Sequence, residues 1–473
     1  METITIDASA PARPFPHFWE QMFGSGRAVL SLRESYRRDL HAVREITGFT
    51  YVRFHGILLD EVGVYDEDKH GQPVYNFSYV DQIYDGVLAA GVKPFVEISF
   101  MPYKLAASQH LQAFWYHPNV SPPKDYAIWD DLITKFTRHL IDRYGIEEVS
   151  TWYFEVWNEP NLDFWTGAPR QRTYFDLYDH TARDIKAVSP KLRVGGPATA
   201  QAAWVGDMIK HAQDSQVPLD FVSTHVYGND KASDVFHTSE NIPRYQMVCR
   251  AVKKVHEEIK SSSRPDLPLI WSEYNAAYDN QVDVTDSIYM GPWLATTIAQ
   301  CDGLTEMMSY WTFSDVFEEQ GVVKTPFYGG FGLIAAGNIP KPSFFAMQLL
   351  HGLGDQRVEN SNPNVLVTKA RDGSLVVAAW NLVNPGSTGT PKTVKLQFKN
   401  VSPDAHVVIR RVDESHGDTL GLWLKMGSPR YPSRSQLEQL QQPRLSEAVP
   451  EKMTNGGLTL QLPVNGLAVL QVK

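Results

Sequence analysis

Residues 151–160 have the sequence TWYFEVWNEP, a short β-rich apolar run that ends in Asn158, Glu159 and Pro160. Aromatic and β-branched residues in such a run favour a buried strand. Seven similar runs precede or follow it, at residues 18–24, 51–57, 93–100, 193–199, 221–227, 267–275 and 306–315. We therefore interpret residues 151–160 as the fourth of eight strands.

Segments with helical periodicity separate these strands. After Ser78, a plausible helix cap, apolar residues recur at helical spacing, namely Val80, Ile83, Tyr84, Val87 and Leu88. Gly145, at a position suited to a left-handed helix cap, closes a second apolar stripe made of Trp129, Leu132, Ile133, Phe136 and Leu140. Eight strand–helix units of about 35 to 40 residues predict a (β/α)₈ TIM barrel. A doubly wound open sheet is the competing fold.

After residue 355 the pattern changes to strands separated by turn residues, which predicts an all-β, sandwich-like domain. The predicted strands are residues 365–368, 375–381, 393–398, 407–412, 458–462 and 467–472, and the last two flank a hairpin-type turn at Asn465-Gly466. We expect an N-terminal strand within residues 1–14 to pair with this sheet, a catalytic barrel over 15–354 and the accessory domain over 355–473. Residues 417–450 form an excursion that could serve subunit contacts or cover the barrel wall.

Charge and cysteine content exclude several classes of partner. Forty-four Lys and Arg against 54 Asp and Glu give a net charge of -10 without a long basic run, which argues against nucleic acid and acidic membranes. Cys249 and Cys301 are the only cysteines, so no disulfide framework or cysteine-rich metal site is expected. The first residues lack a signal pattern and no long apolar window follows, so we predict a cytoplasmic location. A homo-oligomer is compatible with the sequence.

Two glutamates occupy the positions where barrels carry catalytic groups, at the carboxyl ends of strands. Glu159 ends the fourth strand and Glu273 lies near the end of the seventh. These strands lie on opposite sides of an eight-stranded ring, so the two side chains could face each other across its mouth. Two carboxylates about 5 to 5.5 Å apart hydrolyse glycosides with retention of anomeric configuration.

Four motifs in order on the expected strands resemble glycoside hydrolase family 39 of clan A, which contains β-xylosidases and α-L-iduronidases. They are RFHGI at 53–57, FEVWNEPNL at 154–162, STHVY at 223–227 and YWTFSDVFEE at 310–319. The resemblance covers nearly the whole chain, including the β-domain. It implies a glycosidase with Glu159 as general acid/base and Glu273 as nucleophile.

The resemblance also implies roles for residues around the two glutamates. Asn158 would bind the sugar 2-hydroxyl, Tyr227 would donate a hydrogen bond to Glu273, and Arg53 would support the nucleophile. His225 would lie beside Glu273, and His55 is a candidate ligand of a sugar hydroxyl. Trp311 would form the platform under the sugar at subsite −1. Candidates for the leaving-group side are Phe164 and Trp115.

The roles of Glu159 as acid and Glu273 as nucleophile require different protonation states of the two carboxyl groups. Glu273 must be ionised while Glu159 stays protonated, and the first charge raises the pKa of the second group, which predicts a bell-shaped pH profile. Three other glutamates lie deeper in their strands and are interpreted as buried structural carboxylates paired with barrel cations such as Arg53, namely Glu20, Glu97 and Glu155.

The loops after strands seven and eight favour a neutral sugar, because Lys324 is the only cation near them and an iduronide carboxylate calls for Arg or Lys. We therefore predict an exo-β-D-xylosidase acting on short xylo-oligosaccharides, with Glu318 or Glu319 binding a sugar hydroxyl. The alternatives are an α-L-iduronidase-like or α-L-arabinosidase enzyme, or a catalytically silent carbohydrate-binding barrel. Metal-binding motifs are missing, and the calcium-like loop from Asp66 has Phe77 at its twelfth position, so no metal or cofactor is predicted.

Overall fold

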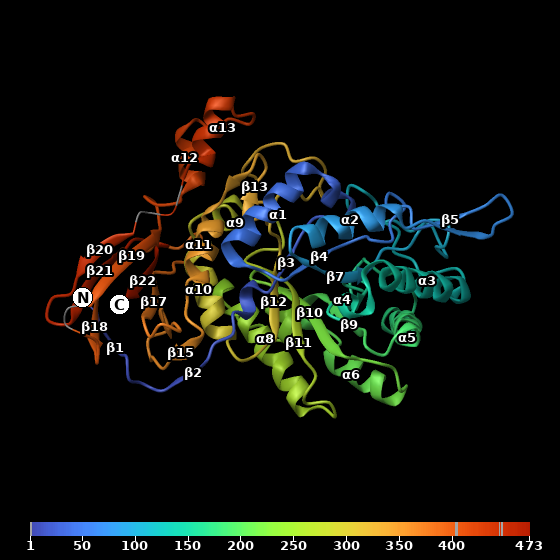
Figure 1. Ribbon diagram of the computed structural model, residues 1–473, viewed down its shortest axis with the longest axis horizontal. Helices are drawn as coiled ribbons and strands as arrows, with labels where there is room; N and C mark the ends of the chain where they lie inside the picture. Colours follow the sequence, from blue (N-terminus) through green and yellow to red (C-terminus); the bar gives the residue numbers. More distant parts are fainter. Residues whose placement is uncertain (1, 403–404, 444, 446–447) are drawn as a thin grey trace.

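Eight parallel strands close into a barrel in the computed structural model, which describes residues 2–402, 405–443, 445 and 448–473 (Figure 1). Around the ring the strands follow the order β10-β11-β12-β3-β4-β7-β8-β9. In chain order they are β3 (Met22–Gly24), β4 (Tyr51–Phe54), β7 (Lys93–Ile98), β8 (Tyr153–Val156), β9 (Arg193–Thr199), β10 (Phe221–Tyr227), β11 (Leu269–Asn275) and β12 (Met307–Tyr310). The predicted (β/α)₈ barrel is confirmed and the open sheet is excluded.

Helices cover the outside of the barrel and fill the connections between its strands. They are η2 (Ala28–Leu32), α1 (Glu34–Thr47), α2 (Ser78–Ala89), α3 (Tyr126–Tyr144), α4 (Ile146–Val149), α5 (Arg170–Val188), η3 (Ala200–Ala202), α6 (Val205–Asp214), α7 (Ala232–Phe236), α8 (Arg244–Ser261), α9 (Val282–Thr285), α10 (Met290–Cys301) and α11 (Pro342–His351). Two short hairpins, β5 (Tyr65–Glu67) with β6 (Pro73–Tyr75) and β13 (Ile334–Ala335) with β14 (Ile339–Pro340), extend the loops.

Several predicted element ends are wrong. Ser78 is the first residue of α2 rather than its cap, and Phe77 stands at the cap position without a side-chain hydrogen bond. Gly145 ends α3 with φ 82° and ψ 148°, which is not the left-handed helical conformation, because the chain turns directly into α4 there. Residues 18–20 form the 3-10 helix η1 (Phe18–Glu20) instead of the start of the first strand.

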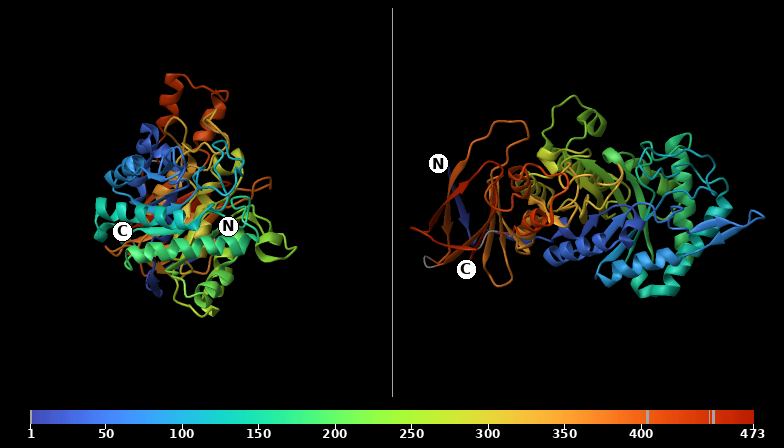
Figure 2. Two further views of the ribbon diagram at one scale, coloured as in Figure 1. Left: turned by 90° about the vertical axis from the view of Figure 1, so that its right-hand side faces the viewer. Right: turned by 90° about the horizontal axis from the view of Figure 1, so that it is seen from above.

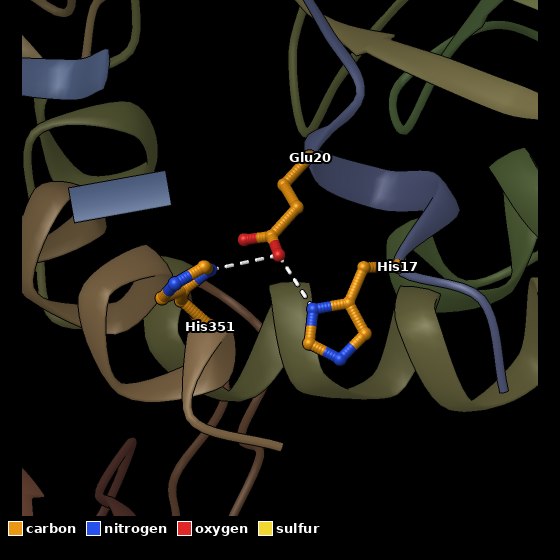
Figure 3. Close-up of side chains that lie close together, drawn as sticks. All are labelled: His17, Glu20 and His351. Carbon is orange, nitrogen blue, oxygen red and sulfur yellow. Dashed lines mark hydrogen bonds and ion pairs between the residues drawn. The ribbon is translucent and has the colours of Figure 1, made fainter. Parts of the chain in front are cut away.

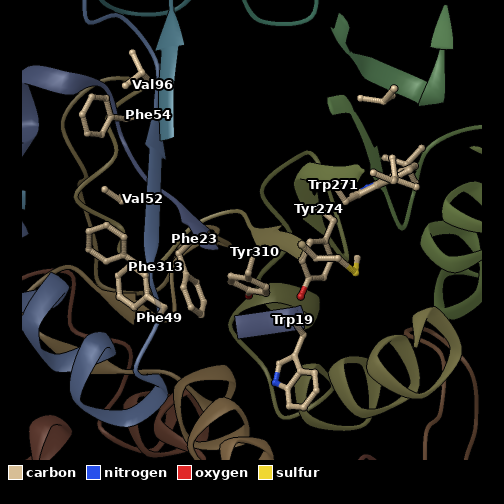
Figure 4. Close-up of a cluster of buried hydrophobic side chains, with 14 of the residues drawn as sticks. Trp19, Phe23, Phe49, Val52, Phe54, Val96, Trp271, Tyr274, Tyr310 and Phe313 are labelled. Atoms are coloured by element: carbon tan, nitrogen blue, oxygen red, sulfur yellow. The ribbon is translucent and has the colours of Figure 1, made fainter. Parts of the chain in front are cut away.

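Inward-facing residues form layers along the barrel axis, because side chains on a strand alternate between its two faces. An apolar layer closes the amino-terminal end of the barrel and consists of Met22, Phe95, Phe221, Ile270 and Met307. Two residues further along the strands, the buried inward positions are polar: Glu97, Ser223 and Ser272. Outward-facing residues pack against the helices in the main core (Figure 4). The polar interior therefore begins halfway up the barrel and leads to its carboxyl end.

The C-terminal residues form two sheets that enclose a second core. A seven-stranded sheet has the order β2 (Ala12–Pro14), β15 (Gln356–Val358), β16 (Val365–Lys369), β17 (Leu375–Trp380), β22 (Leu467–Val472), β19 (His406–Val412) and β20 (Val449–Lys452). The second sheet contains β1 (Glu2–Asp7), β18 (Lys392–Lys399) and β21 (Gly457–Leu462). β1 runs parallel to β18 and β2 pairs with β15, so both chain ends lie on this domain (Figures 1 and 2).

The predicted hairpin at Asn465-Gly466 is wrong, because the turn joins the two sheets. β21 pairs with β18, whereas β22 lies between β17 and β19. Both edges of β22 are thus occupied and cannot accept β21. β22 is also buried on both faces: Leu470 belongs to the sandwich core, and Leu467 belongs to the core shared with the barrel.

The barrel and the β-domain share a buried interface formed by α10, α11 and the seven-stranded sheet (Figure 1). Along β17, Val377 faces the sandwich core while Val376 and Trp380 face the barrel side. Next to this interface a disulfide joins Cys249 of α8 to Cys301 of α10. This single bridge was not predicted from the sequence, and it forms because the two helices are neighbours around the barrel.

The excursion at 417–450 contains two helices that project beyond the barrel, α12 (Thr419–Lys425) and α13 (Arg434–Gln441) (Figure 1). Their residues Leu420, Trp423 and Leu440 pack on Phe327 and Ile339. This part of the excursion therefore covers the segment that follows β12, while residues 444, 446 and 447 lie outside the described residues. None of the helices described is long and apolar enough to cross a membrane.

Candidate active site

A cavity of about 490 Å³ opens at the carboxyl end of the barrel. Nine of the predicted site residues line it: His55, Asn158, Glu159, Phe164, His225, Tyr227, Glu273, Trp311 and Glu319. Arg53 lies beneath it, fully buried. Glu318 and Trp115 are not among the lining residues. The strand-end positions in the sequence therefore identify most of the cavity wall.

The two candidate catalytic carboxylates face each other across this cavity. An oxygen of Glu159 and an oxygen of Glu273 lie within 4.8 Å of one another, and their side chains are 12% and 5% exposed. Inverting glycosidases hold the two groups about 6.5 to 9.5 Å apart to admit a water molecule, whereas retaining enzymes hold them at about 5 to 5.5 Å. The separation fits attack by one carboxylate on the sugar carbon.

Glu273 accepts a hydrogen bond on each oxygen. Arg53 Nη1 donates to Oε1 at 2.6 Å, and the Tyr227 hydroxyl donates to Oε2 at 2.6 Å. Burial and the Glu273 charge raise the pKa of Tyr227 well above its usual value, so the phenol keeps its proton as donor. A buried cation and a neutral donor thus hold the Glu273 carboxylate in a fixed orientation.

Arg53 is the centre of a charged network inside the barrel. Its Nε donates to Glu155 Oε2 at 2.6 Å, and its Nη2 lies 2.8 Å from Glu97 Oε2. The same nitrogen donates to Asn158 Oδ1 at 3.0 Å. The interpretation of Glu97 and Glu155 as buried partners of Arg53 is confirmed. Glu20 is buried as expected, but it lies in η1 rather than in a strand, and its partners are His17 and His351 instead of Arg53.

Glu159 lies in a site that favours its protonated form. Burial, followed by the charge of Glu273, raises its pKa well above the usual value. His225 Nδ1 lies 3.0 Å from Glu159 Oε1, and its Nε2 lies 3.0 Å from Ser272 Oγ. Burial lowers the pKa of His225 well below its usual value. The imidazole is therefore neutral, and it orients Glu159 without adding a positive charge that would lower the carboxyl pKa.

A bulge in β11 turns Glu273 toward the cavity. Thr224 of β10 pairs with Trp271 and the next residue, His225, pairs with Glu273, so β11 carries one extra residue at Ser272. Strict alternation after Ile270 would point Glu273 outward, and the extra residue reverses its side.

The turn after β8 is also irregular. Trp157 and Glu159 have positive φ values of 72° and 44°, which side chains other than glycine rarely adopt. Two hydrogen bonds hold this turn: Glu159 N–H donates to Ala198 O at 2.8 Å, and Trp157 Nε1 donates to Phe164 O at 2.6 Å. The acid/base candidate therefore sits on a fixed, strained segment.

His55, Glu319 and Trp311 form a further part of the cavity wall. His55 Nδ1 bonds Glu97 Oε2 at 2.8 Å, and its Nε2 lies 3.7 Å from Glu319 Oε1. Burial is the largest single effect and lowers the pKa of His55, but the charge and hydrogen bond of Glu97 together with the charge of Glu273 outweigh it and raise the pKa overall. Burial, with a contribution from the charge of nearby carboxylates, raises the pKa of Glu319 to about 8. The Trp311 ring is buried and lies above the Arg53 guanidinium at 5.7 Å.

The structure does not bring Glu318 or Trp115 into the cavity. Glu318 pairs with Arg33, whose Nη2 donates to Oε2 at 3.0 Å, and with Arg27 at 3.5 Å, so these cations hold its side chain away. Trp115 is 52% exposed, and its neighbour Phe114 lines the cavity in its place, packing on Phe164 at 5.2 Å. Neighbouring loop residues point in different directions, which a sequence pattern does not determine.

Several lining residues were not predicted, namely Gln112, Phe114, Leu162, Ala200, Gln201, Asp230, Lys231, Asp234, Tyr278 and Phe331. Asp230 and Lys231 follow the sixth strand by only a few residues, so the strand-end rule applied to all eight strands would have found them. Lys324, the cation noted near the loops after strands seven and eight, does not line the cavity, whereas Lys231 after the sixth strand does.

Comparisons with known proteins agree with this geometry. Residues 2–457 match "Glycosyl hydrolases family 39". The chain is 39% identical to a beta-xylosidase of Geobacillus stearothermophilus, covering 100% of this chain and 96% of the relative, and 37% identical to one of Caldicellulosiruptor saccharolyticus, covering 99% and 97%. A monomeric beta-xylosidase of Caulobacter crescentus CB15 superposes with a TM-score of 0.90 at 34% identity, over 100% of this chain and 99% of that one. The chain therefore belongs to glycosyl hydrolase family 39.

Proposed function

We propose that the protein is a retaining exo-β-D-xylosidase that removes terminal xylosyl residues from short xylo-oligosaccharides. The observation that carries this proposal is the pair of buried carboxylates within 4.8 Å, of which Glu273 accepts two strong hydrogen bonds and Glu159 has a raised pKa. The two full-length relatives named beta-xylosidase support the choice of sugar.

In the first step the Glu273 carboxylate attacks the anomeric carbon and the glycosidic bond breaks. The Glu159 proton moves to the leaving oxygen, so an alcohol leaves and an α-xylosyl ester of Glu273 remains. Arg53 and Tyr227, which bond the Glu273 carboxylate beforehand, keep it oriented for this attack.

In the second step water attacks the anomeric carbon of the xylosyl ester and gives a proton to Glu159, and the bond between that carbon and the Glu273 oxygen breaks to return Glu273 as carboxylate. Esterification removes the negative charge that raises the Glu159 pKa, so the pKa of Glu159 falls when it must act as a base. β-Xylose leaves with the configuration of the substrate.

The cavity wall supplies the remaining contacts in this proposal. Asn158 Oδ1 accepts from Arg53, which leaves the amide nitrogen to donate to the 2-hydroxyl. Trp311 offers an apolar face under the ring, and His55 with Glu319 binds hydroxyls on the other side. Phe164 and Phe114 line the leaving-group side.

Charge in the cavity favours a neutral sugar. Among the described residues, five acidic side chains line it, Glu159, Asp230, Asp234, Glu273 and Glu319, against Lys231 as the one lysine or arginine. The raised pKa values of Glu159 and Glu319 favour their protonated forms, but the other three acidic residues still outnumber the single lysine. This lining disfavours an iduronide carboxylate and supports a neutral sugar.

The chemistry proposed uses no metal. Glu159, His225 and Glu273 offer atoms close enough to hold an ion. However, Arg53 and Tyr227 already donate hydrogen bonds to the two oxygens of Glu273. The Arg53 guanidinium supplies the positive charge that a metal ion would otherwise bring to this carboxylate.

Release of aryl groups from a β-xyloside, a β-glucoside, an α-L-arabinoside and an α-L-iduronide tests the proposal, with Glu273→Ala as the matched blank. We expect preferential cleavage of the β-xyloside that the substitution abolishes. Cleavage of the iduronide in preference would overturn the choice of sugar, and no cleavage of any glycoside would favour a carbohydrate-binding barrel.

We also propose a cytoplasmic location. Disulfides are rare in the cytosol, so Cys249 and Cys301 should then be reduced in the cell and bridge on oxidation. Alkylation during lysis, followed by mass spectrometry, should find two labelled cysteines, and an unlabelled bridged pair would contradict the proposal.

A further inference from the structure

Two histidines and a glutamate converge at the amino-terminal end of the barrel, opposite the cavity (Figure 3). His17 precedes η1, Glu20 ends it, and His351 is the last residue of α11. His17 Nδ1 lies 2.5 Å from Glu20 Oε1, and His351 Nδ1 lies 2.9 Å from the same oxygen. The catalytic chemistry uses none of these residues.

We propose that His17, Glu20 and His351 bind a zinc ion, with water as the fourth ligand. Imidazole nitrogens and a carboxylate oxygen are usual zinc ligands at about 2.0 to 2.2 Å, which places ligand atoms about 3.3 Å apart in a tetrahedral site. The three donor atoms already lie within 4.8 Å of one another. Shifts of less than about 1 Å would therefore admit the ion.

Burial of Glu20 argues for a ligand beyond the two histidines. Its side chain is 3% exposed, and its Oε2 has no hydrogen-bond partner among the described residues. A buried carboxylate oxygen without a partner is costly, and two histidines on Oε1 do not relieve that cost. A zinc ion on this carboxylate, with its bound water donating a hydrogen bond to Oε2, would relieve it.

The site is preorganised on one side and open on the other. The His17 ring stacks on the buried Trp19 ring at 4.5 Å, which fixes its orientation. The His351 side chain is 47% exposed, so an ion and its water can enter from solvent. The ion would join the segment before β3 to α11, 331 residues further along the chain. Because Glu20 and His351 are so far apart in sequence, no short motif could reveal the site.

Cobalt(II) and zinc binding to the metal-stripped protein test the proposal. We expect one cobalt per chain with the strong visible absorption of a tetrahedral site, displacement of the cobalt by zinc, and a higher melting temperature with zinc, because binding to the folded state alone stabilises it. His351→Ala and His17→Ala should each weaken zinc affinity about tenfold or more.

His70→Ala is the matched control, because His70 is an exposed histidine on the β5–β6 hairpin and should leave zinc affinity unchanged. Zinc affinity equal in the wild type and in His351→Ala, or no cobalt spectrum in the wild type, would overturn the proposal and leave a hydrogen-bonded triad. Each readout is independent of glycosidase activity, so the test stands whatever the substrate proves to be.

Discussion

Single charges around Glu159 set the pH range in which the acid/base works. Burial raises the Glu159 pKa most, the Glu273 charge raises it next, and the Asp230 charge adds to both. Asp230 is held by the Tyr227 N–H, which donates to its Oδ2 at 2.7 Å, and burial raises its own pKa to about 6. Above about pH 6 Asp230 is therefore ionised and helps to keep the proton on Glu159.

Asp230→Asn should shift the alkaline limb of kcat/KM to lower pH. Glu159 must be protonated in the first step, so activity falls as pH rises through its raised pKa, and removing the Asp230 charge lowers that pKa. The asparagine oxygen can still accept from Tyr227. Asp163→Asn is the control, because Asp163 lies on an exposed turn and its substitution should leave the alkaline limb of kcat/KM at the same pH. If Asp230→Asn also left the alkaline limb in place, the proposed effect of the Asp230 charge would be wrong.

Gly24 allows Trp311 to lie flat against β3. A Cβ atom on Gly24 would lie 2.0 Å from Trp311 Cε3, so Gly24→Ala must displace the ring. Displacement of a binding surface by about 1 Å can cost up to about 100-fold in rate, and we expect kcat/KM for an aryl xyloside to fall about 10- to 100-fold. Gly206→Ala, which meets no atom within 4 Å, should leave activity unchanged. Equal activity of both variants would exclude Trp311 as the platform.

At the scale of elements, one buried lysine organises the segment after β12. Lys341 Nζ lies 2.6 Å from Asp286 Oδ1 and 2.6 Å from Asp315 Oδ2, and it donates to Gly330 O at 2.9 Å. All three charged side chains are fully buried. The cluster ties the segment that carries Glu319 and Phe331 to the start of α11.

Lys341→Met should destabilise the protein by about 3 to 5 kcal/mol, because it leaves two buried carboxylates without their cation. Urea unfolding followed by tryptophan fluorescence measures the loss, and kcat/KM should fall with it. Replacing both aspartates by asparagine in the Lys341→Met background should recover part of the stability. A loss below about 1 kcal/mol would show that the cluster does not hold the segment.

The sequence predicts elements better than it predicts their irregularities. Short apolar runs separated by helical segments locate all eight barrel strands. The rule that barrels carry catalytic groups at the carboxyl ends of strands finds Glu159 and Glu273. The bulge at Ser272 leaves no periodic signal, because it depends on pairing with β10. The direction of Glu318 depends on Arg33, 285 residues away in the chain. Contacts of this kind form only when the barrel closes.

At the scale of the molecule, we propose that the barrel over 15–354 and the β-domain over 355–473 fold as one cooperative unit. Val376, Trp380 and Leu467 of the β-domain belong to the same buried cluster as the barrel helices. β1 and β2 add the beginning of the chain to both sheets of the β-domain. Separation of the two parts would expose this apolar interface to water.

Differential scanning calorimetry should therefore show one unfolding transition, and a chain ended after residue 354 should fail to give a folded barrel. Trp380→Ala should lower the melting temperature of that single transition, since truncation of a buried tryptophan costs about 3 to 5 kcal/mol. Two separate transitions, of which Trp380→Ala shifts one alone, would contradict a shared core.

Azide rescue distinguishes the role of Glu159 as acid/base from that of Glu273 as nucleophile. With an activated aryl β-xyloside, azide should occupy the space of the missing carboxylate in Glu273→Ala and give α-xylosyl azide. In Glu159→Ala the glycosyl-enzyme still forms, and azide should attack it to give β-xylosyl azide. Proton NMR distinguishes the two anomers. The opposite assignment of anomers, or the same anomer from both variants, would contradict the mechanism.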